Sequence, residues 1–193
     1  MNYTWATSGP WIENKETDTE YKYEVDGNTL YIAFKGSTGR EDWKQNFSFW
    51  IRPYKNMPVK WFAHAGFVRK WKSIEDDILS IIEKEQPDNV YIYGFSQGGA
   101  IAVLAHEAVI FNYPLLDGLT LTWGAPRVVW AWNYNKIYDR FYGVIRLEKT
   151  WDIVPKLPPW IFGYKHVGVG IKMGHLIRSD MFNFKKNHMS YGG

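Results

Sequence analysis

The sequence contains no cysteine, no long hydrophobic run and little excess charge of either sign. Without cysteine, disulfide bonds, thiolate metal sites and a cysteine nucleophile are all excluded. No apolar stretch approaches the roughly 18 residues that a membrane-spanning helix requires. Lys and Arg number 23 and Asp and Glu number 20, and the resulting formal charge of +3 is too small to indicate a nucleic-acid-binding surface.

The N-terminus also lacks the basic and apolar regions of a secretory signal, so we expect a cytoplasmic protein or one released without a conventional signal. A length of 193 residues suits one domain with a full hydrophobic core. Because no repeat, linker or low-complexity stretch divides the chain, we expect a single domain over residues 1–193. Aromatic residues are abundant instead, at 18% of the chain.

Apolar periodicity predicts alternating strands and helices. Residues 21–34 alternate in polarity on both sides of Asp26-Gly27-Asn28, which predicts an antiparallel β-hairpin. Helical spacing predicts one helix over 68–85 and another over 97–111. Short apolar runs or alternation predict four further strands, at 90–93, 119–123, 143–147 and 165–172. This order is typical of an α/β sheet with parallel crossover connections.

A G-x-S-x-G motif, Gly94-Phe95-Ser96-Gln97-Gly98, lies between a predicted strand and a predicted helix. This setting is typical of a nucleophile elbow, in which a sharp turn presents the serine at the carboxyl end of the sheet. Glycine suits both ends of so tight a turn because it has no Cβ. A phosphate-binding turn is the alternative, but no lysine follows as that motif requires.

A serine nucleophile needs a general base and an acid that orients the base, and in this architecture they follow in the order serine, acid, histidine. Asp152 comes after a predicted strand, where such an acid belongs, whereas Asp139 falls in a predicted helix and Asp117 in a turn. His106 falls inside the helix after Ser96 and is expected to be packed or capping. Spacing leaves three candidate bases: His166, His175 and His188.

Further sequence blocks occur in a fixed order between Leu30 and Tyr191. They are Phe34-Lys35-Gly36-Ser37-Thr38, His64-Ala65-Gly66-Phe67, the elbow, Trp123-Gly124-Ala125-Pro126-Arg127-Val128, the stretch from Asp152 to Pro159, Tyr164-Lys165-His166-Val167-Gly168 and His188-Met189-Ser190-Tyr191. Together these blocks resemble the class 3 lipase family, the fungal-lipase-like branch of the α/β hydrolases. The resemblance implies an α/β-hydrolase fold, with a mostly parallel central sheet flanked by helices and an N-terminal antiparallel hairpin.

The same resemblance implies residue roles. It identifies Ser96 as the nucleophile, Asp152 as the orienting acid and His188 as the general base, and it demotes His166. The oxyanion hole would consist of the backbone N–H groups of Ser37 and Gln97. Metal ions and cofactors are not expected, because this triad chemistry requires neither.

The implied activity is hydrolysis of carboxylic esters with apolar acyl chains, by a triacylglycerol lipase or carboxylesterase that forms an acyl-enzyme. A phospholipase A1-type enzyme or an aromatic-ester esterase would use the same triad. A non-catalytic lipid-binding relative is a further alternative, but it would need a broken triad, and all three positions are filled. The expected partner is a lipid ester, with transient contact to a lipid surface.

Aromatic residues gather around the segments expected to form the site. We expect Trp43, Trp50 and Trp160 to bind substrate by lining an acyl groove or touching lipid. The alternative is that they pack in the core, as most large aromatic side chains do. His64 is expected to be a buried imidazole bonded to backbone, and Arg127 a structural donor to carbonyl groups.

Overall fold

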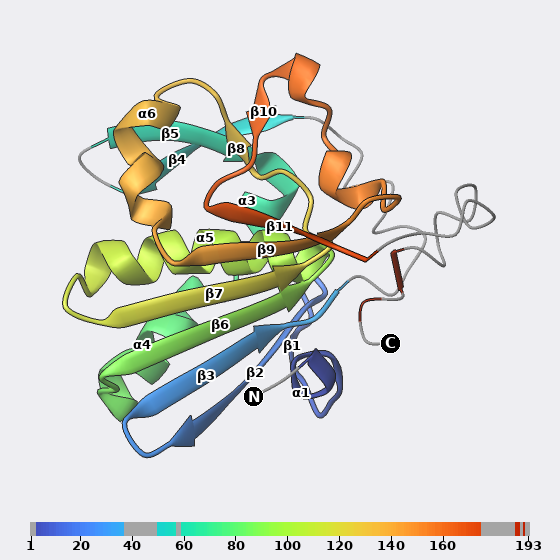
Figure 1. The fold of residues 1–193 in the computed structure, drawn as a ribbon. Coiled ribbons are helices and arrows are strands. Elements are labelled where there is room, and N and C mark those ends of the chain that lie inside the picture. Colours follow the sequence, from blue (N-terminus) through green and yellow to red (C-terminus); the bar gives the residue numbers. More distant parts are fainter. Residues whose placement is uncertain (1–2, 37–49, 57–58, 175–187, 190, 192–193) are drawn as a thin grey trace.

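The structure is a computed structural model that describes residues 3–36, 50–56, 59–174, 188–189 and 191. A seven-stranded central sheet forms its middle layer, in the order β1-β2-β3-β6-β7-β9-β11 (Figure 1). Its strands are β1 (Ile12–Asn14), β2 (Thr19–Asp26), β3 (Thr29–Phe34), β6 (Asn89–Phe95), β7 (Asp117–Trp123), β9 (Val144–Lys149) and β11 (Val169–Met173). The β1–β2 and β2–β3 pairs are antiparallel, and all later pairs are parallel.

The predicted N-terminal hairpin is confirmed. Strands β2 and β3 pair with Val25 opposite Leu30 and Asp26 opposite Thr29, which leaves a two-residue connection. Gly27 in that connection has φ +55°, a backbone conformation that glycine adopts without a steric penalty. The predicted alternation of strands and helices in the rest of the central sheet is also confirmed.

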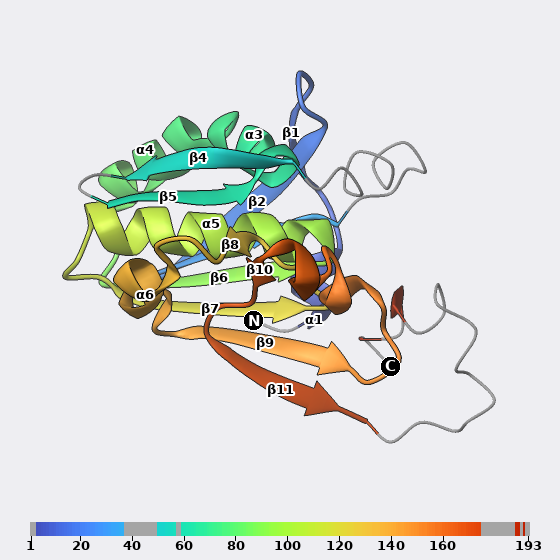
Figure 2. The ribbon, with the colours of Figure 1, turned by 90° about the horizontal axis from the view of Figure 1, so that it is seen from above.

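Helices cover the central sheet unequally. They are α1 (Tyr3–Thr7), α3 (Ala65–Lys72), α4 (Glu75–Glu85), α5 (Gln97–Asn112) and α6 (Tyr134–Ile137), with short 3₁₀ turns η1 (Tyr138–Phe141), η2 (Val154–Lys156) and η3 (Trp160–Phe162). Figure 2 shows α3, α4 and α5 together on one side of β6, β7 and β9. Helix α1 contacts β3 and β6, and its Trp5 packs edge-on against Tyr31 and Tyr93. Among the described residues, none of the helices is long and apolar enough to cross a membrane.

The single helix predicted over 68–85 is wrong, because the structure divides it into α3 and α4 at Ser73 and Ile74. The Ser73 hydroxyl lies 2.6 Å from Thr17 Oγ1, and the Ser73 carbonyl accepts a hydrogen bond of 2.9 Å from the Asn14 side chain. These partners come from the end of β1 and from the β1–β2 connection, far away in sequence. Apolar periodicity continues through the break and therefore gives no sign of it.

A second, antiparallel sheet was not predicted. It consists of β4 (Ile51–Asn56), β5 (Val59–His64), β8 (Val129–Trp130) and β10 (Tyr164–Lys165), in the order β10-β8-β5-β4. Trp61 and Ala63 on β5 are fully buried. Pro53 lies on β4, the edge strand of this sheet, where proline is tolerated, but a proline within a run argues against a strand when only the sequence is considered.

The strand predicted over 165–172 is likewise wrong, because β10 and β11 share those residues between the two sheets. Gly168 lies between them with φ +64°, and a Cβ there would overlap the carbonyl oxygen of Val144. Glycine therefore allows the chain to leave the second sheet and enter the central one. The alternation of Val167, Val169 and Ile171 passes through this turn, so polarity alone predicts continuity.

Helix α5 lies at the centre of the packing and is buried on almost every side. Its polar side chains therefore require internal partners. His106 lies 2.9 Å from Thr120 Oγ1 through Nδ1 and 2.8 Å from the Tyr142 carbonyl through Nε2. Burial lowers the pKa of His106 to about 4, so its imidazole is neutral at pH 7. The prediction that His106 is a packed residue is confirmed.

Candidate active site

Ser96 occupies the sharp turn between β6 and α5. Its φ of +54° and ψ of −122° lie in a region that non-glycine residues rarely adopt. Such strain persists where the surroundings enforce it, and it is common at functional sites. The Ser96 amide donates to the carbonyl of Trp123 at 2.9 Å, which ties the turn to the end of β7.

The two glycines of the motif are required by close backbone approach. A Cβ on Gly94 would overlap the carbonyl oxygen of Gly98, and a Cβ on Gly98 would overlap that of Phe34. Gly94 therefore allows the two ends of the turn to approach each other, and Gly98 allows the turn to approach the end of the neighbouring strand β3. The steric reason inferred from the motif is therefore present in the structure.

The structure brings Ser96, His188 and Asp152 into one hydrogen-bonded chain. The Ser96 hydroxyl lies 2.7 Å from His188 Nε2, and His188 Nδ1 lies 2.8 Å from Asp152 Oδ2. All three side chains are buried. Because the Asp152 carboxylate accepts a hydrogen bond from Nδ1–H, Nε2 carries no proton and can accept the proton of the serine hydroxyl.

The loop that carries Asp152 is fixed from several sides. The Val154 amide donates to Asp152 Oδ1 at 2.9 Å, where the chain enters η2. The Arg127 guanidinium donates to the carbonyls of Lys156 and Pro158, the latter at 2.9 Å. Arg127 thus connects the stretch that follows β7 to the acid loop, as a structural donor to carbonyl groups.

The other histidines have different surroundings. His166 lies 2.6 Å from the Pro155 carbonyl through Nε2 and 3.6 Å from Glu148, so its ring supports the acid loop rather than the serine. Burial, followed by the nearby Arg146 charge, lowers the pKa of His166 to about 4. His64 is buried and stacks on Phe67 with ring centroids 4.3 Å apart. His175 lies outside the described residues.

Aromatic packing holds the His188 ring in place. Phe95 stacks on His188 at 4.8 Å with an interplanar angle of 26°, and Tyr191 meets His188 nearly edge-on. Phe95 and Tyr191 belong to a small core cluster with Trp123. Their positions, one residue before the serine and three after the base, were the available sequence signals.

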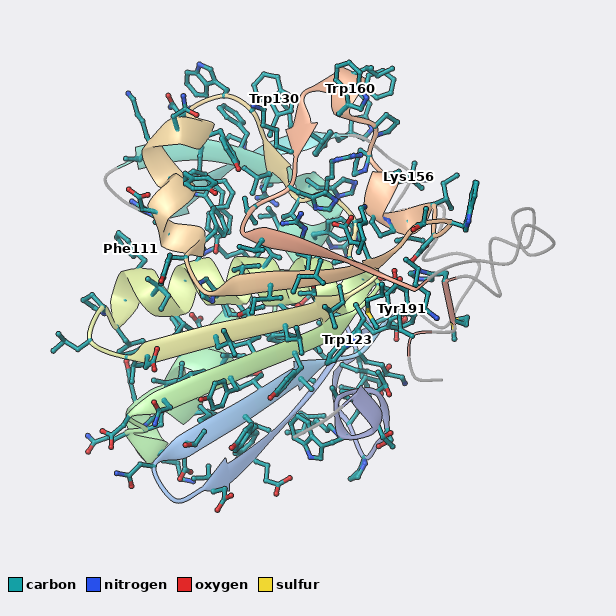
Figure 3. All side chains as sticks on the ribbon, in the orientation of Figure 1. Phe111, Trp123, Trp130, Lys156, Trp160 and Tyr191 are labelled. Carbon is teal, nitrogen blue, oxygen red and sulfur yellow. The ribbon has the colours of Figure 1, made fainter. Side chains whose placement is uncertain are left out.

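The predicted oxyanion and substrate-binding residues divide into described and undescribed positions. Gln97 is buried and begins α5, where backbone N–H groups have no acceptor within the helix. Ser37 and Trp43 lie outside the described residues. Trp50 and Trp160 are 76% and 71% exposed. In Figure 3, Trp160 lies near the top of the molecule with Trp130, whereas Tyr191 lies lower, beside Trp123.

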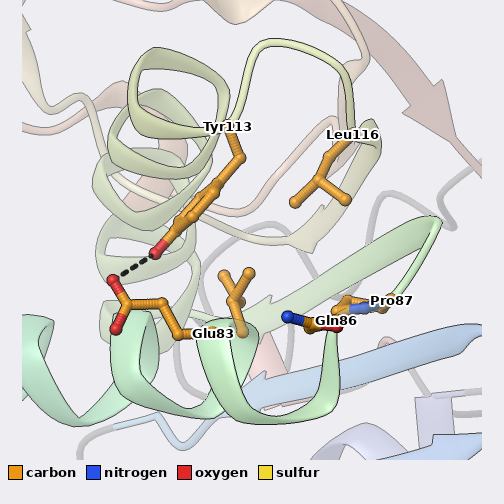
Figure 4. A pocket seen from close by; sticks show the side chains of 6 residues that line it. Glu83, Gln86, Pro87, Tyr113 and Leu116 are labelled. Atoms are coloured by element: carbon orange, nitrogen blue, oxygen red, sulfur yellow. Dashed lines mark hydrogen bonds between the residues drawn. The ribbon is translucent and has the colours of Figure 1, made fainter.

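One cavity of about 370 Å³ lies far from the serine. Its walls come from the ends of α4 and α5: Ile82, Glu83, Gln86, Pro87, Tyr113 and Leu116. Figure 4 shows Tyr113 reaching toward Glu83, to whose carboxylate its hydroxyl donates at 3.2 Å. Ser96 precedes the opposite end of α5, whose 16 residues span about 24 Å. This cavity is therefore separate from the candidate active site.

Comparisons with known proteins give a consistent result. The chain is 30% identical over 151 residues to a lipase of Rhizomucor miehei, a match that covers 72% of this chain and 40% of that protein. It is 27% identical over 144 residues to secreted mono- and diacylglycerol lipase 1 of Fusarium solani, covering 71% and 41% of the two chains. The chain thus matches about two fifths of the length of these relatives.

Solved structures show the same fold. One, described as "a serine protease triad forms the catalytic centre of a triacylglycerol lipase", superposes with a TM-score of 0.72 at 25% identity, covering 86% of this chain and 66% of that one. The lipase of Rhizopus microsporus var. chinensis gives a TM-score of 0.72 at 26% identity, covering 86% and 61%. The predicted α/β-hydrolase fold is confirmed. Because the family profile described as "Lipase (class 3)" matches residues 31–162, more than half of the sequence, the chain belongs to the class 3 lipase family.

Proposed function

We propose that the protein is a serine hydrolase that cleaves carboxylic esters with apolar acyl chains, as a triacylglycerol lipase or carboxylesterase. The observation that carries this proposal is the buried chain of hydrogen bonds from Ser96 through His188 to Asp152. Membership of the class 3 lipase family supports it, as do relatives named as lipases. The strained turn at Ser96 adds a third argument, because that geometry places the serine hydroxyl at the carboxyl end of the sheet.

The reaction follows from the order of the three side chains. Ser96 Oγ attacks the ester carbonyl carbon while His188 Nε2 takes the hydroxyl proton, and Asp152 stabilises the resulting imidazolium. The amides of Gln97 and Ser37 hold the oxyanion. The tetrahedral intermediate then expels the alcohol, which receives the proton from His188, and leaves an acyl-enzyme. Water activated by His188 attacks the acyl group, releases the carboxylic acid and restores Ser96.

The exposed aromatic residues support a finer proposal about the substrate. Trp160, Ile161 and Phe162 form consecutive exposed positions in η3, which follows the acid loop, and the exposed Trp50 directly precedes β4 of the second sheet. The hydroxyl of Tyr164, two residues after η3, donates to the Trp50 carbonyl at 3.3 Å. Contiguous exposed apolar side chains are typical of surfaces that contact a partner or a lipid phase. We propose that η3 and Trp50 touch the surface of aggregated lipid, with Trp43 and Trp160 helping to bind the acyl chain.

The triad is tested by Ser96→Ala, with Ser80→Ala on the exposed face of α4 as the matched control. We expect Ser96→Ala to lower turnover of p-nitrophenyl butyrate by at least about a thousandfold and to abolish labelling by a fluorophosphonate probe. Ser80→Ala should behave as the wild type. Circular dichroism melting checks that both variants fold. Labelling or turnover that survives in Ser96→Ala would contradict the assignment of the nucleophile.

The lipid-surface proposal needs a second comparison. Replacing Ile161 and Phe162 together by serine, with Trp160 kept, should leave hydrolysis of a soluble short-chain ester unchanged. Hydrolysis of emulsified tributyrin should fall by about tenfold or more, because the apolar contact area is lost. Equal rates on the emulsion would refute the role of η3. Phosphatidylcholine vesicles and soluble aromatic esters, assayed in parallel, identify a phospholipase A1-type enzyme or an aromatic-ester esterase.

A further inference from the structure

The Asp152 carboxylate accepts a hydrogen bond that the triad does not need. Oδ2, which accepts the His188 Nδ1 proton, also lies 2.9 Å from the hydroxyl of Tyr191. Oδ1 accepts the amide of Val154 at 2.9 Å. Asp152 is fully buried, and a buried charge is costly unless its lone pairs are satisfied. Among the described residues, the Tyr191 hydroxyl is therefore one of three hydrogen-bond donors to this buried carboxylate.

Tyr191 is itself held in one orientation. Its hydroxyl accepts the backbone N–H of Lys149 at 2.8 Å, at the end of β9. With that acceptor site filled, the hydroxyl proton is directed to Asp152. The Tyr191 ring is buried and contacts Phe95 at a centroid distance of 6.1 Å. The side chain thus has a fixed donor, a fixed acceptor and a packed ring.

The backbone at Gly124 passes close to the point where the side chains of Asp152, His188 and Tyr191 meet. Gly124 has φ +59°, and a Cβ there would lie 2.8 Å from Asp152 Oδ2 and 3.0 Å from both His188 Cε1 and Tyr191 Cε2. One missing side chain thus leaves room for the acid, the base and the tyrosine together. This is an observation independent of the hydrogen bonds.

We propose that Tyr191 is a positioning residue of the triad, which shares the Asp152 carboxylate with His188 and thereby sets both the orientation of the acid and the strength of its field at the imidazole. The proposal rests on the proposed function. It adds that the segment carrying His188 also supplies, through Tyr191, a further hydrogen-bond donor to the acid.

The hydrogen bond has a defined electrostatic consequence. A phenol that donates to Oδ2 draws negative charge away from the oxygen that faces His188. Burial, followed by the Asp152 charge, raises the pKa of the Tyr191 hydroxyl, so it remains a donor throughout the working pH range. Without this donor, the full carboxylate charge acts on His188 and stabilises the imidazolium. The inactive, protonated base then persists to higher pH.

The test is Tyr191→Phe, which removes the hydroxyl and keeps the ring. We expect kcat for p-nitrophenyl butyrate to fall about tenfold with KM unchanged, because a hydrogen bond to a charged group is lost. The acid limb of the kcat/KM profile should move up by about half a pH unit. Titration with a fluorophosphonate counts the competent active sites. The rate is then divided by that number, so protein that has not folded does not lower kcat. Tyr113→Phe is the matched control, since its hydroxyl bonds to Glu83 at the far end of α5.

A purely structural role for Tyr191 would lower the number of competent sites without moving the acid limb, and that result would overturn the proposal. If Tyr191→Phe does not fold, 3-fluorotyrosine at position 191 keeps the hydroxyl and makes it a stronger donor. The acid limb should then move to lower pH, and an unmoved limb would again overturn the inference. Wild-type protein that cleaves no ester and takes no probe would instead refute the proposed function.

Discussion

Single glycines matter at this site because the backbone passes where a side chain would stand. Gly124 and Gly27 have nearly the same positive φ, +59° and +55°, but different surroundings. A Cβ at position 124 would meet Asp152 and His188, whereas nothing lies within 4 Å of one at position 27. Substitutions at these two glycines therefore separate the effect of backbone strain from the effect of crowding Asp152 and His188.

We predict that Gly124→Ala lowers kcat by about a hundredfold, because a displacement of about 1 Å at the reacting groups can cost that much. Both Gly124→Ala and Gly27→Ala should lose about 1–2 kcal/mol of unfolding free energy from left-handed backbone strain. Gly27→Ala should keep wild-type kcat. Urea unfolding and ester turnover measure the two quantities, and a fully active Gly124→Ala would show that the triad tolerates a methyl group there.

Helix α5 shows how an element makes stability depend on pH. His106 has a pKa of about 4 in the folded protein, against about 6.5 for the free side chain. Between these values the unfolded chain binds more protons, so the unfolding free energy rises with pH across that window. The stability contributed by neutral His106 is complete above pH 6.5 and is lost as the pH falls toward 4.

We predict that His106→Gln flattens this dependence. Glutamine offers an N–H to the Tyr142 carbonyl, as Nε2 does, but cannot become charged. Between pH 7 and pH 4 the wild type should lose about 3 kcal/mol more unfolding free energy than the variant. Urea titrations at a series of pH values provide the measurement. His166 and the carboxylates contribute equally to both proteins, so identical slopes would mean that His106 does not titrate in this range.

At the scale of the whole molecule, the N-terminus supports the site from the other face of the central sheet. Ala6 on α1 packs in one cluster with Phe95 and Tyr191, which hold the base. Lys22 on β2 fastens α1 by donating to the carbonyls of Trp5 and Ser8, the latter at 2.7 Å. The Lys22 ammonium also lies 4.2 Å from the Trp5 ring centroid, a cation–π contact.

We predict that Lys22→Met weakens the docking of α1. The unfolding free energy should fall by about 1–2 kcal/mol, because the ammonium's hydrogen bonds and its cation–π contact are lost. Limited proteolysis should cut the N-terminal segment sooner, and kcat should fall a few-fold as the packing beneath Phe95 loosens. Lys84→Met is the control, since Lys84 is an exposed residue paired with Glu85 on α4. Equal proteolysis of the two variants would show that Lys22 does not hold α1.

Some residues of the candidate site could be predicted from the local sequence, and others could not. The elbow at Ser96 was predictable because its glycines and its strand–turn–helix setting are local properties of the chain. Asp152 was predictable from its place after a strand. Spacing left His166, His175 and His188 equivalent, and only the family resemblance favoured His188. The structure adds the contact, because Ser96 and His188 are 92 positions apart in the sequence and are brought together by packing rather than by any local pattern.

From its residues alone, this chain specified the hairpin, the parallel strands, helix α5 and the turn that carries Ser96, because polarity periods and glycine positions act over a few neighbours. The break at Ser73, the second sheet and the contacts of Tyr191 with Asp152 depend on partners remote in sequence. A single domain, and a location in the cytoplasm or release without a conventional signal, stay predictions. Side chains far apart in the sequence become neighbours only when the core closes, so the hydrogen bonds that connect Ser96, His188 and Asp152 belong to the folded molecule.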